Sequence, residues 1–144
     1  WREIDGTVIS VDNSKVIIQT SRYSVAEYEI AKDTWFVDWS AKTDGSVQTL
    51  HSGDEVTVSV GTERTALFFE RTYSPRFKVS GTVTDVSGRA VIVTGDYGTF
   101  RAEMRKDAYV YKDGGITDYT AVEKGDKVSL SGTDADSIGL VVVK

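Results

Sequence analysis

The sequence predicts an all-β protein made of two small antiparallel β-barrels, one in residues 1–74 and the other in residues 75–144. Three observations support this prediction. One pattern of strand and turn residues occurs twice in the same order. Short segments of β-branched and aromatic residues alternate with Gly, Asp and Ser, which is typical of antiparallel strands joined by turns. No stretch has a helical period over three turns.

The repeat is carried by three segments of each half. They are Gly-Thr-Val at 6–8 and 81–83, Lys-Asp-x-aromatic-x at 32–36 and 106–110, and apolar-x-x-Gly-Asp-x-Val at 50–56 and 122–128. Because such a repeat duplicates one structural unit, we expect both halves to have the same fold. The segment Tyr73-Ser74-Pro75 holds the only proline of the chain and is the expected joint.

Each half is expected to contain six short strands, because its runs of Val, Ile, Thr and aromatic residues are bounded by turn residues. The expected strands of the first half are residues 4–11, 15–20, 25–31, 34–39, 55–61 and 64–72. Those of the second half are residues 78–87, 90–95, 98–104, 108–112, 127–132 and 138–143.

Alternation within these strands predicts which face is buried. In residues 55–61, valine occupies positions 56, 58 and 60, and polar residues occupy the positions between them. A sheet of about six short strands must cover its apolar face, and closure into a barrel also removes exposed strand edges. We therefore predict two OB-like barrels in series.

A Gly-Asp pair precedes a strand in each half, as Gly53-Asp54 and Gly125-Asp126. We expect the glycine to adopt the left-handed conformation of a turn and the aspartate to accept backbone N–H groups. The motif is thus predicted to be a turn and not a phosphate-binding loop.

Charge and composition restrict the partners. A formal net charge of -5 opposes binding to nucleic acids and anionic membranes, and acidic neighbours offset the densest basic stretch, which contains Arg101, Arg105 and Lys106. No apolar run is long enough for a membrane span. The chain has no cysteine, which excludes disulfides and thiolate metal sites. It opens on Trp1 and not on Met, so we expect a fragment of a longer or processed protein.

No set of residues predicts catalysis, a metal site or a bound cofactor. The single histidine, His51, precedes Ser52 and Asp54, but residues so close together in a turn point apart and are unsuited to a Ser-His-Asp triad. The acidic pairs at 27/29 and 134/136 are interpreted as solvated strand and turn residues. We therefore predict that the protein is not an enzyme.

Aromatic residues of the first half, Trp35, Trp39 and Tyr23, are the candidate ligand-binding residues, because exposed planar rings can stack on sugar faces. Packing of the rings in the core or between the two units is the favoured interpretation, since large aromatic side chains supply much of the buried area of small domains. Trp35 also corresponds to Tyr109 of the second half, which suggests a core or barrel-mouth position. Trp39 has no aromatic counterpart there and is the better ligand candidate.

The Gly-Thr-Val, Lys-Asp-x-aromatic-x and apolar-x-x-Gly-Asp-x-Val segments resemble the small β-barrel repeats of bacterial surface-layer (S-layer) and S-layer-homology proteins, especially those of Gram-positive bacteria. The resemblance covers nearly the whole chain. It implies an extracellular, non-catalytic structural or interaction module at the cell surface or in the cell wall. Its partners would be other domains of the same protein or neighbouring surface proteins.

The alternative is a module that binds a carbohydrate or cell-wall polysaccharide through exposed aromatic residues. Solvent exposure distinguishes the two functions. An exposed surface that contains Trp35 and Trp39 favours sugar binding, whereas buried rings favour a structural module.

Overall fold

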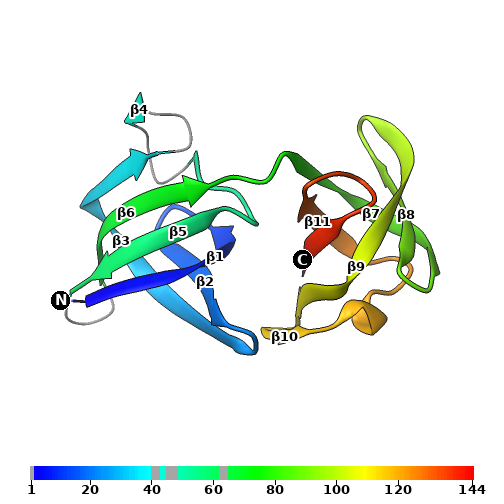
Figure 1. Cartoon of the computed structure of the whole chain (residues 1–144), viewed down its shortest axis with the longest axis horizontal. Coiled ribbons are helices and arrows are strands. Elements are labelled where there is room, and N and C mark those ends of the chain that lie inside the picture. Colours follow the sequence, from blue (N-terminus) through cyan, green and yellow to red (C-terminus); the bar gives the residue numbers. More distant parts are fainter. Residues whose placement is uncertain (1, 40–42, 45–48, 62–64) are drawn as a thin grey trace. The chain divides into compact units, whose positions relative to one another are not determined.

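The computed structural model describes residues 2–39, 43–44, 49–61 and 65–144. The chain divides into two units, Trp1–Ser74 and Pro75–Lys144, and each unit forms a β-barrel (Figure 1). These barrels confirm the all-β fold that the sequence predicts. Crossing a membrane as a helix would require a long apolar helix, and the described residues contain none.

The first barrel is closed by five strands, with a sixth, very short strand beside them. The strands are β1 (Arg2–Val11), β2 (Lys15–Ser21), β3 (Ser24–Asp38), β4 (Thr43–Asp44), β5 (Glu55–Val60) and β6 (Thr65–Tyr73). β1 pairs with β2 and β5, β5 with β6, β6 with β3, and β3 with β2, which completes the ring. β4 pairs with the end of β3.

The second barrel has the same arrangement. Its elements are β7 (Phe77–Ser87), β8 (Ala90–Gly95), β9 (Gly98–Lys112), β10 (Gly115–Thr117), a 3-10 helix (Tyr119–Ala121), β11 (Lys127–Gly132) and β12 (Ile138–Val143). β7 pairs with β8 and β11, β11 with β12, β12 with β9, and β9 with β8. Each barrel thus has the five strands of an OB-type barrel.

The strands differ from the prediction in two ways in each barrel. The short strands β4 and β10 were not predicted, and two of the expected strands are joined into one. The expected strands 25–31 and 34–39 form the single strand β3, and the corresponding pair in the second barrel forms β9. Each long strand pairs with one neighbour along its first half and with another along its second half. At the change in β3, the Thr34 hydroxyl donates to the Ala66 carbonyl oxygen at 2.8 Å. Residue 64, where the sixth strand was expected to begin, lies outside the described residues.

The pairings that close the rings, β3 with β6 and β9 with β12, are parallel. We expected antiparallel pairing throughout. Parallel neighbours cannot be joined by a tight turn, and here two other strands of the same barrel lie between them in the chain. The positions of the turns in the sequence therefore did not indicate these two pairings.

Each barrel encloses a core of its own. Val56, Val58 and Val60 of β5 are at most 3% exposed, which confirms the predicted inner face. Burial of one aliphatic or Phe side chain stabilises the fold by roughly 1.5–3 kcal/mol. The remaining buried core residues of the first barrel are Val8, Val16, Ile18, Tyr28, Phe36, Leu50, Ala66 and Phe69. Those of the second are Val83, Val91, Val93, Ala102, Met104, Ala108, Val110, Val122, Val128, Leu130, Ile138 and Val141.

Candidate functional site

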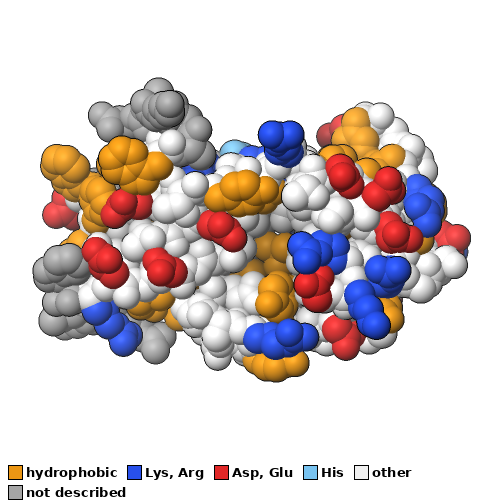
Figure 2. Space-filling view, viewed as in Figure 1, with side chains coloured by type: hydrophobic (Ala, Val, Ile, Leu, Met, Phe, Trp, Pro, Cys, Tyr) orange, Lys and Arg blue, Asp and Glu red, His pale blue; other side chains and the backbone are white. Residues whose placement is uncertain are grey.

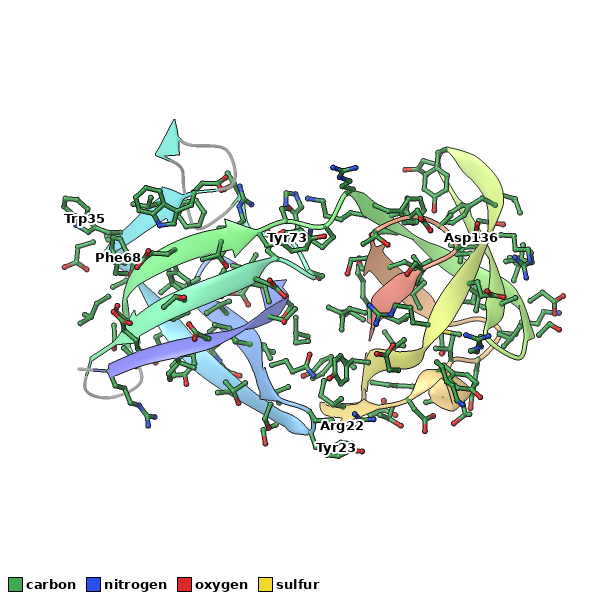
Figure 3. The ribbon with its side chains drawn as sticks, in the orientation of Figure 1. Arg22, Tyr23, Trp35, Phe68, Tyr73 and Asp136 are labelled. Carbon is green, nitrogen blue, oxygen red and sulfur yellow. The ribbon has the colours of Figure 1, made fainter. Side chains whose placement is uncertain are left out.

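Trp35 and Trp39 lie on the outside of the first barrel, on β3 and its immediate extension. Strand alternation directs Phe36 and Asp38 inward and the alternate positions, Trp35 and Trp39, outward. Trp35 is 71% exposed and Trp39 is 58% exposed, and Figure 3 shows Trp35 pointing away from the barrel. Trp39 continues the pairing with β6, because its N–H donates to the Arg71 carbonyl oxygen at 3.0 Å. The interpretation of these two rings as core residues is therefore wrong.

Tyr23 lies apart from the two tryptophans. It is in the turn between β2 and β3, at the other end of the first barrel from Trp35 (Figure 3), and is exposed. The Arg22 guanidinium carbon lies 5.6 Å from the centroid of its ring, and Arg22 Nε donates to its hydroxyl at 3.1 Å. The nearby rings of Tyr28 and Phe36 are buried in the core. The three candidates therefore form a tryptophan pair and a separate tyrosine.

Strand β6 adds two apolar side chains that the sequence did not lead us to single out. The register between β5 and β6 shifts at Leu67, so Leu67 and Phe68 lie outside while Ala66 and Phe69 enter the core. Phe68 is the register partner of Trp35 across the parallel pairing of β3 and β6. The sequence did contain a sign of outward-facing apolar side chains here. Residues 66–69 are four consecutive apolar residues, and they cannot all point to one face of a strand.

A hollow of about 380 Å³ lies beside these rings and is lined by Glu3, Ser59, Leu67, Phe68 and Glu70. Its residues come from the neighbouring strands β1, β5 and β6. Trp39 Nε1 donates to Glu70 Oε2 at 2.7 Å, which fixes the ring and the carboxylate relative to each other. We define the aromatic face of the first barrel as the five lining residues together with Trp35 and Trp39.

The net charge of the chain resides in its first half. Residues 1–74 contain seven Lys or Arg and twelve Asp or Glu, a net charge of -5, whereas residues 75–144 contain ten of each. Asp5 lies on β1 two residues after Glu3 and pairs with Thr57 of β5. Its carboxylate accepts a hydrogen bond from the Thr57 hydroxyl at 2.7 Å. Figure 2 shows acidic side chains among the hydrophobic ones over β3 and β6. A polyanion would therefore meet repulsion at the aromatic face.

The Gly-Asp motif forms a turn in both barrels, as predicted. Gly53 and Gly125 have φ angles of 94° and 97°, in the left-handed region that favours glycine. The Oδ2 atoms of Asp54 and Asp126 each accept the backbone N–H of the residue three positions earlier, at 2.8 and 2.9 Å. The two halves of the chain therefore use the motif in the same way.

Asp54 is also the centre of a buried charge network. Arg71 donates through Nη1 to Asp54 Oδ2 at 2.9 Å and through Nη2 to Asp38. The Ser74 hydroxyl donates to Asp54 Oδ1 at 2.6 Å. The hydrogen bond with the Asp38 carboxylate raises the pKa of Arg71, so the guanidinium stays charged. The network ties the Gly-Asp turn to the ends of β3 and β6.

The contacts of His51, Ser52 and Asp54 do not resemble a catalytic triad. The Ser52 hydroxyl donates to the Ile9 carbonyl oxygen at 2.6 Å and is thus directed to the backbone. His51 is exposed, and its Nδ1 lies 3.9 Å from Asp54 Oδ2, an oxygen that also accepts from Arg71. The described residues include no group of three or more His, Asp or Glu side chains that could hold a metal ion. That the protein is not an enzyme stays a prediction.

In the second barrel, a lysine takes the place of the arginine. Lys112 Nζ, at the end of β9, donates to Asp126 Oδ2 at 3.1 Å and to the Ala121 carbonyl oxygen at 2.9 Å. The hydrogen bond with Asp126 raises the pKa of Lys112. The aspartate of the Gly-Asp turn thus has a cationic partner in both barrels, from β6 in the first and from β9 in the second.

This lysine predicts a pH-dependent difference in stability. Because its pKa is raised in the folded state, charged Lys112 contributes stability that is fully present below its unfolded-state pKa of about 10.5 and is lost as the pH rises through the folded-state value. We expect Lys112→Met to have a lower Tm than the unaltered protein at neutral pH, and we expect this difference to shrink above about pH 10.5. Thermal denaturation followed by circular dichroism measures it, with the exposed Lys106→Met as the control. A difference that stays constant across this pH range would contradict the prediction.

Comparison with protein-family models finds no match for the chain, and comparison with curated proteins finds none either.

Proposed function

We propose that the chain is a non-catalytic module of a bacterial cell-surface protein and that its first barrel binds a cell-wall glycan through the aromatic face. The surface location, outside the cell, is supported by the resemblance of the repeated segments to S-layer-type repeats. Glycan binding is supported by one structural observation: Trp35 and Trp39 are both more than half exposed on one side of the first barrel. Exposure of this kind favours sugar binding over a purely structural module.

A ligand that covers the exposed tryptophans of this face would gain binding free energy from the burial of their rings. A tryptophan buries about 150–250 Å² when covered, so covering the exposed part of one ring would contribute roughly 2–4 kcal/mol. Leu67 and Phe68 enlarge the apolar area beside the rings. Contiguous apolar surface of this kind marks interaction sites in soluble proteins.

A glycan matches this surface chemically. One face of a pyranose ring presents mainly C–H groups, which pack on a flat indole, and its hydroxyls can donate to Glu3, Ser59 and Glu70 in the adjoining hollow. Trp35 and Trp39 are four residues apart in extended chain, about 13 Å, so a ligand that covers both is an oligosaccharide. OB-type barrels bind both oligosaccharides and oligonucleotides, and the negative charge of the first barrel disfavours oligonucleotides.

The second barrel is proposed to have the structural role, in contact with other domains of the parent protein or with neighbouring surface proteins. It has no counterpart of the tryptophan pair: Tyr109, which corresponds to Trp35, is half-buried, and Asp113, which corresponds to Trp39, is a turn residue with a φ of 54°. Its acidic and basic residues are equal in number. In the basic stretch on β9, Arg101 and Arg105 form ion pairs with Glu103 and Asp107.

Tryptophan fluorescence tests the proposed glycan binding, since all three tryptophans lie in the first half of the chain. We expect a saturable change in emission on titration with a soluble cell-wall polysaccharide. We expect Trp39→Ala to weaken binding by about 30-fold or more, because truncating a tryptophan hot spot costs about 2 kcal/mol or more. Trp35 still reports binding in this variant.

The matched control is Tyr23→Ala, which removes an exposed aromatic ring at the other end of the same barrel and should leave the affinity unchanged. If polysaccharide does not change the emission of the unaltered protein, glycan binding is refuted and only the structural role remains. Equal affinities of the two variants would show that any binding occurs away from the aromatic face.

A further inference from the structure

We infer that the aromatic face selects glycans that carry free amino groups, that is, amino sugars whose nitrogen is not acetylated. The inference rests on the proposed function and specifies the class of glycan. It depends on the hollow beside the tryptophans and on the charges that line it.

The hollow combines apolar and acidic side chains. Leu67 and Phe68 of β6 supply its apolar surface, and Glu3 of β1 and Glu70 of β6 supply two carboxylates. Strand β5 lies between β1 and β6 and contributes Ser59. A ligand group placed over Ser59 would therefore have a carboxylate on each side.

The two carboxylates have no cationic partner in the part of the chain that the structure describes, because every ion pair found there involves other acidic residues. Glu70 accepts a hydrogen bond from the neutral indole of Trp39, which takes one of the several acceptor sites of a carboxylate. Glu27 on the same barrel, by contrast, is paired with Lys15 at 3.1 Å. Among the described residues, the negative charge of the hollow is thus uncompensated and lies beside apolar surface, so its field favours a cation.

A sugar with a free amine satisfies both features of the site. Its ring packs on the exposed indoles, while its ammonium group forms charge-assisted hydrogen bonds with Glu70 and Glu3 in the hollow. The ammonium group is also attracted to the electron-rich face of a nearby tryptophan. An N-acetylated sugar has the same ring without the positive charge, and an anionic wall polymer would be repelled by the acidic first barrel.

Two oligosaccharides of equal length test this selectivity, because glucosamine and N-acetylglucosamine oligomers share one backbone and differ at the nitrogen. The full chain is titrated with each oligomer at low salt, and tryptophan emission is recorded. We expect the glucosamine oligomer to bind about tenfold more tightly or better. We expect this preference to decrease as added salt screens the charges.

A pair of variants locates the amine in the hollow. Glu70→Gln keeps a side-chain oxygen that can accept from Trp39 Nε1, so the ring keeps its hydrogen bond while the charge is removed. We expect it to lose most of the preference for the glucosamine oligomer and to keep its affinity for the acetylated one. The control Glu27→Gln removes the same charge from the same barrel at the ion pair with Lys15 and should retain the preference.

Equal binding of the two oligomers, or tighter binding of the acetylated one, would overturn the proposed selectivity for free amines. The proposed glycan binding would not be affected by either result. Binding of neither oligomer, together with no response to cell-wall polysaccharide, would overturn the proposed function itself. A preference that is as large in Glu70→Gln as in Glu27→Gln would overturn the assignment of the amine to this hollow.

Discussion

Asp54→Ala is expected to lower the free energy of unfolding of the first barrel by about 3–5 kcal/mol, because it removes one partner of a buried ion pair. The Asp54 side chain is fully buried and accepts hydrogen bonds from Arg71, from Ser74 and from the backbone N–H of His51. In the variant, Arg71 loses one of its two carboxylate partners inside the protein, and the backbone N–H of the turn loses its acceptor. Both losses leave polar groups that are costly to bury.

Urea denaturation followed by tryptophan emission measures this effect, since the tryptophans report on the first barrel. Asp54→Asn separates the two contributions, because its amide oxygen can still accept the His51 N–H while the charge is absent. We expect it to be less destabilised than Asp54→Ala. Asp33→Ala, at an exposed position of β3, is the control and should change stability by less than about 0.5 kcal/mol. A loss below about 1 kcal/mol for Asp54→Ala would mean that the network contributes little.

Gly81→Ala is expected to destabilise the second barrel by about 1–3 kcal/mol, because the added methyl group has no room. A Cβ at this position would lie 2.6 Å from the Thr94 carbonyl oxygen and 2.7 Å from Val93 Cγ1, so β7 and β8 would have to move apart. Gly6 has the same position in the first barrel, with a Cβ 2.6 Å from the Gln19 carbonyl oxygen. Close approach of two strands thus explains the glycine of the repeated Gly-Thr-Val segment.

Thermal denaturation followed by circular dichroism tests the glycine substitution, because the second barrel holds none of the tryptophans. Gly139→Ala in β12 is the matched control. No atom lies within 4 Å of a Cβ added there, so we expect no loss of stability. Equal midpoints for the two variants would contradict the steric explanation.

Strand positions and turns were predictable because they depend on neighbours in the chain. The expected strands 127–132 and 138–143 match β11 and β12, and the Gly-Asp pair forms the predicted turn in both barrels. Alternation of apolar and polar residues is enough to locate a strand and its inner face. Gly and Asp favour the backbone conformations and local hydrogen bonds of a turn wherever they occur.

The site was less predictable, because alternation shows that Trp35 and Trp39 share a face but not that the face is outside. Apolar character suggested that these rings were buried. The opposite face of β3 instead carries Phe36 and Asp38 into the barrel. Burial of Asp38 is possible because Arg71, from the strand that closes the ring, provides its partner. No local pattern near residue 38 reveals that pairing.

The sequence by itself determined two all-β units, the places of their strands, the turns that separate them and the acidic character of the first half. Tertiary structure decided which strands close each ring, which charged groups are buried together, and that Glu3, Phe68 and Glu70 lie beside the tryptophans. The physical reason is that side-chain alternation and turn preferences act between neighbours in the chain. The aromatic face depends on pairings between distant strands, which exist only when the barrel is closed.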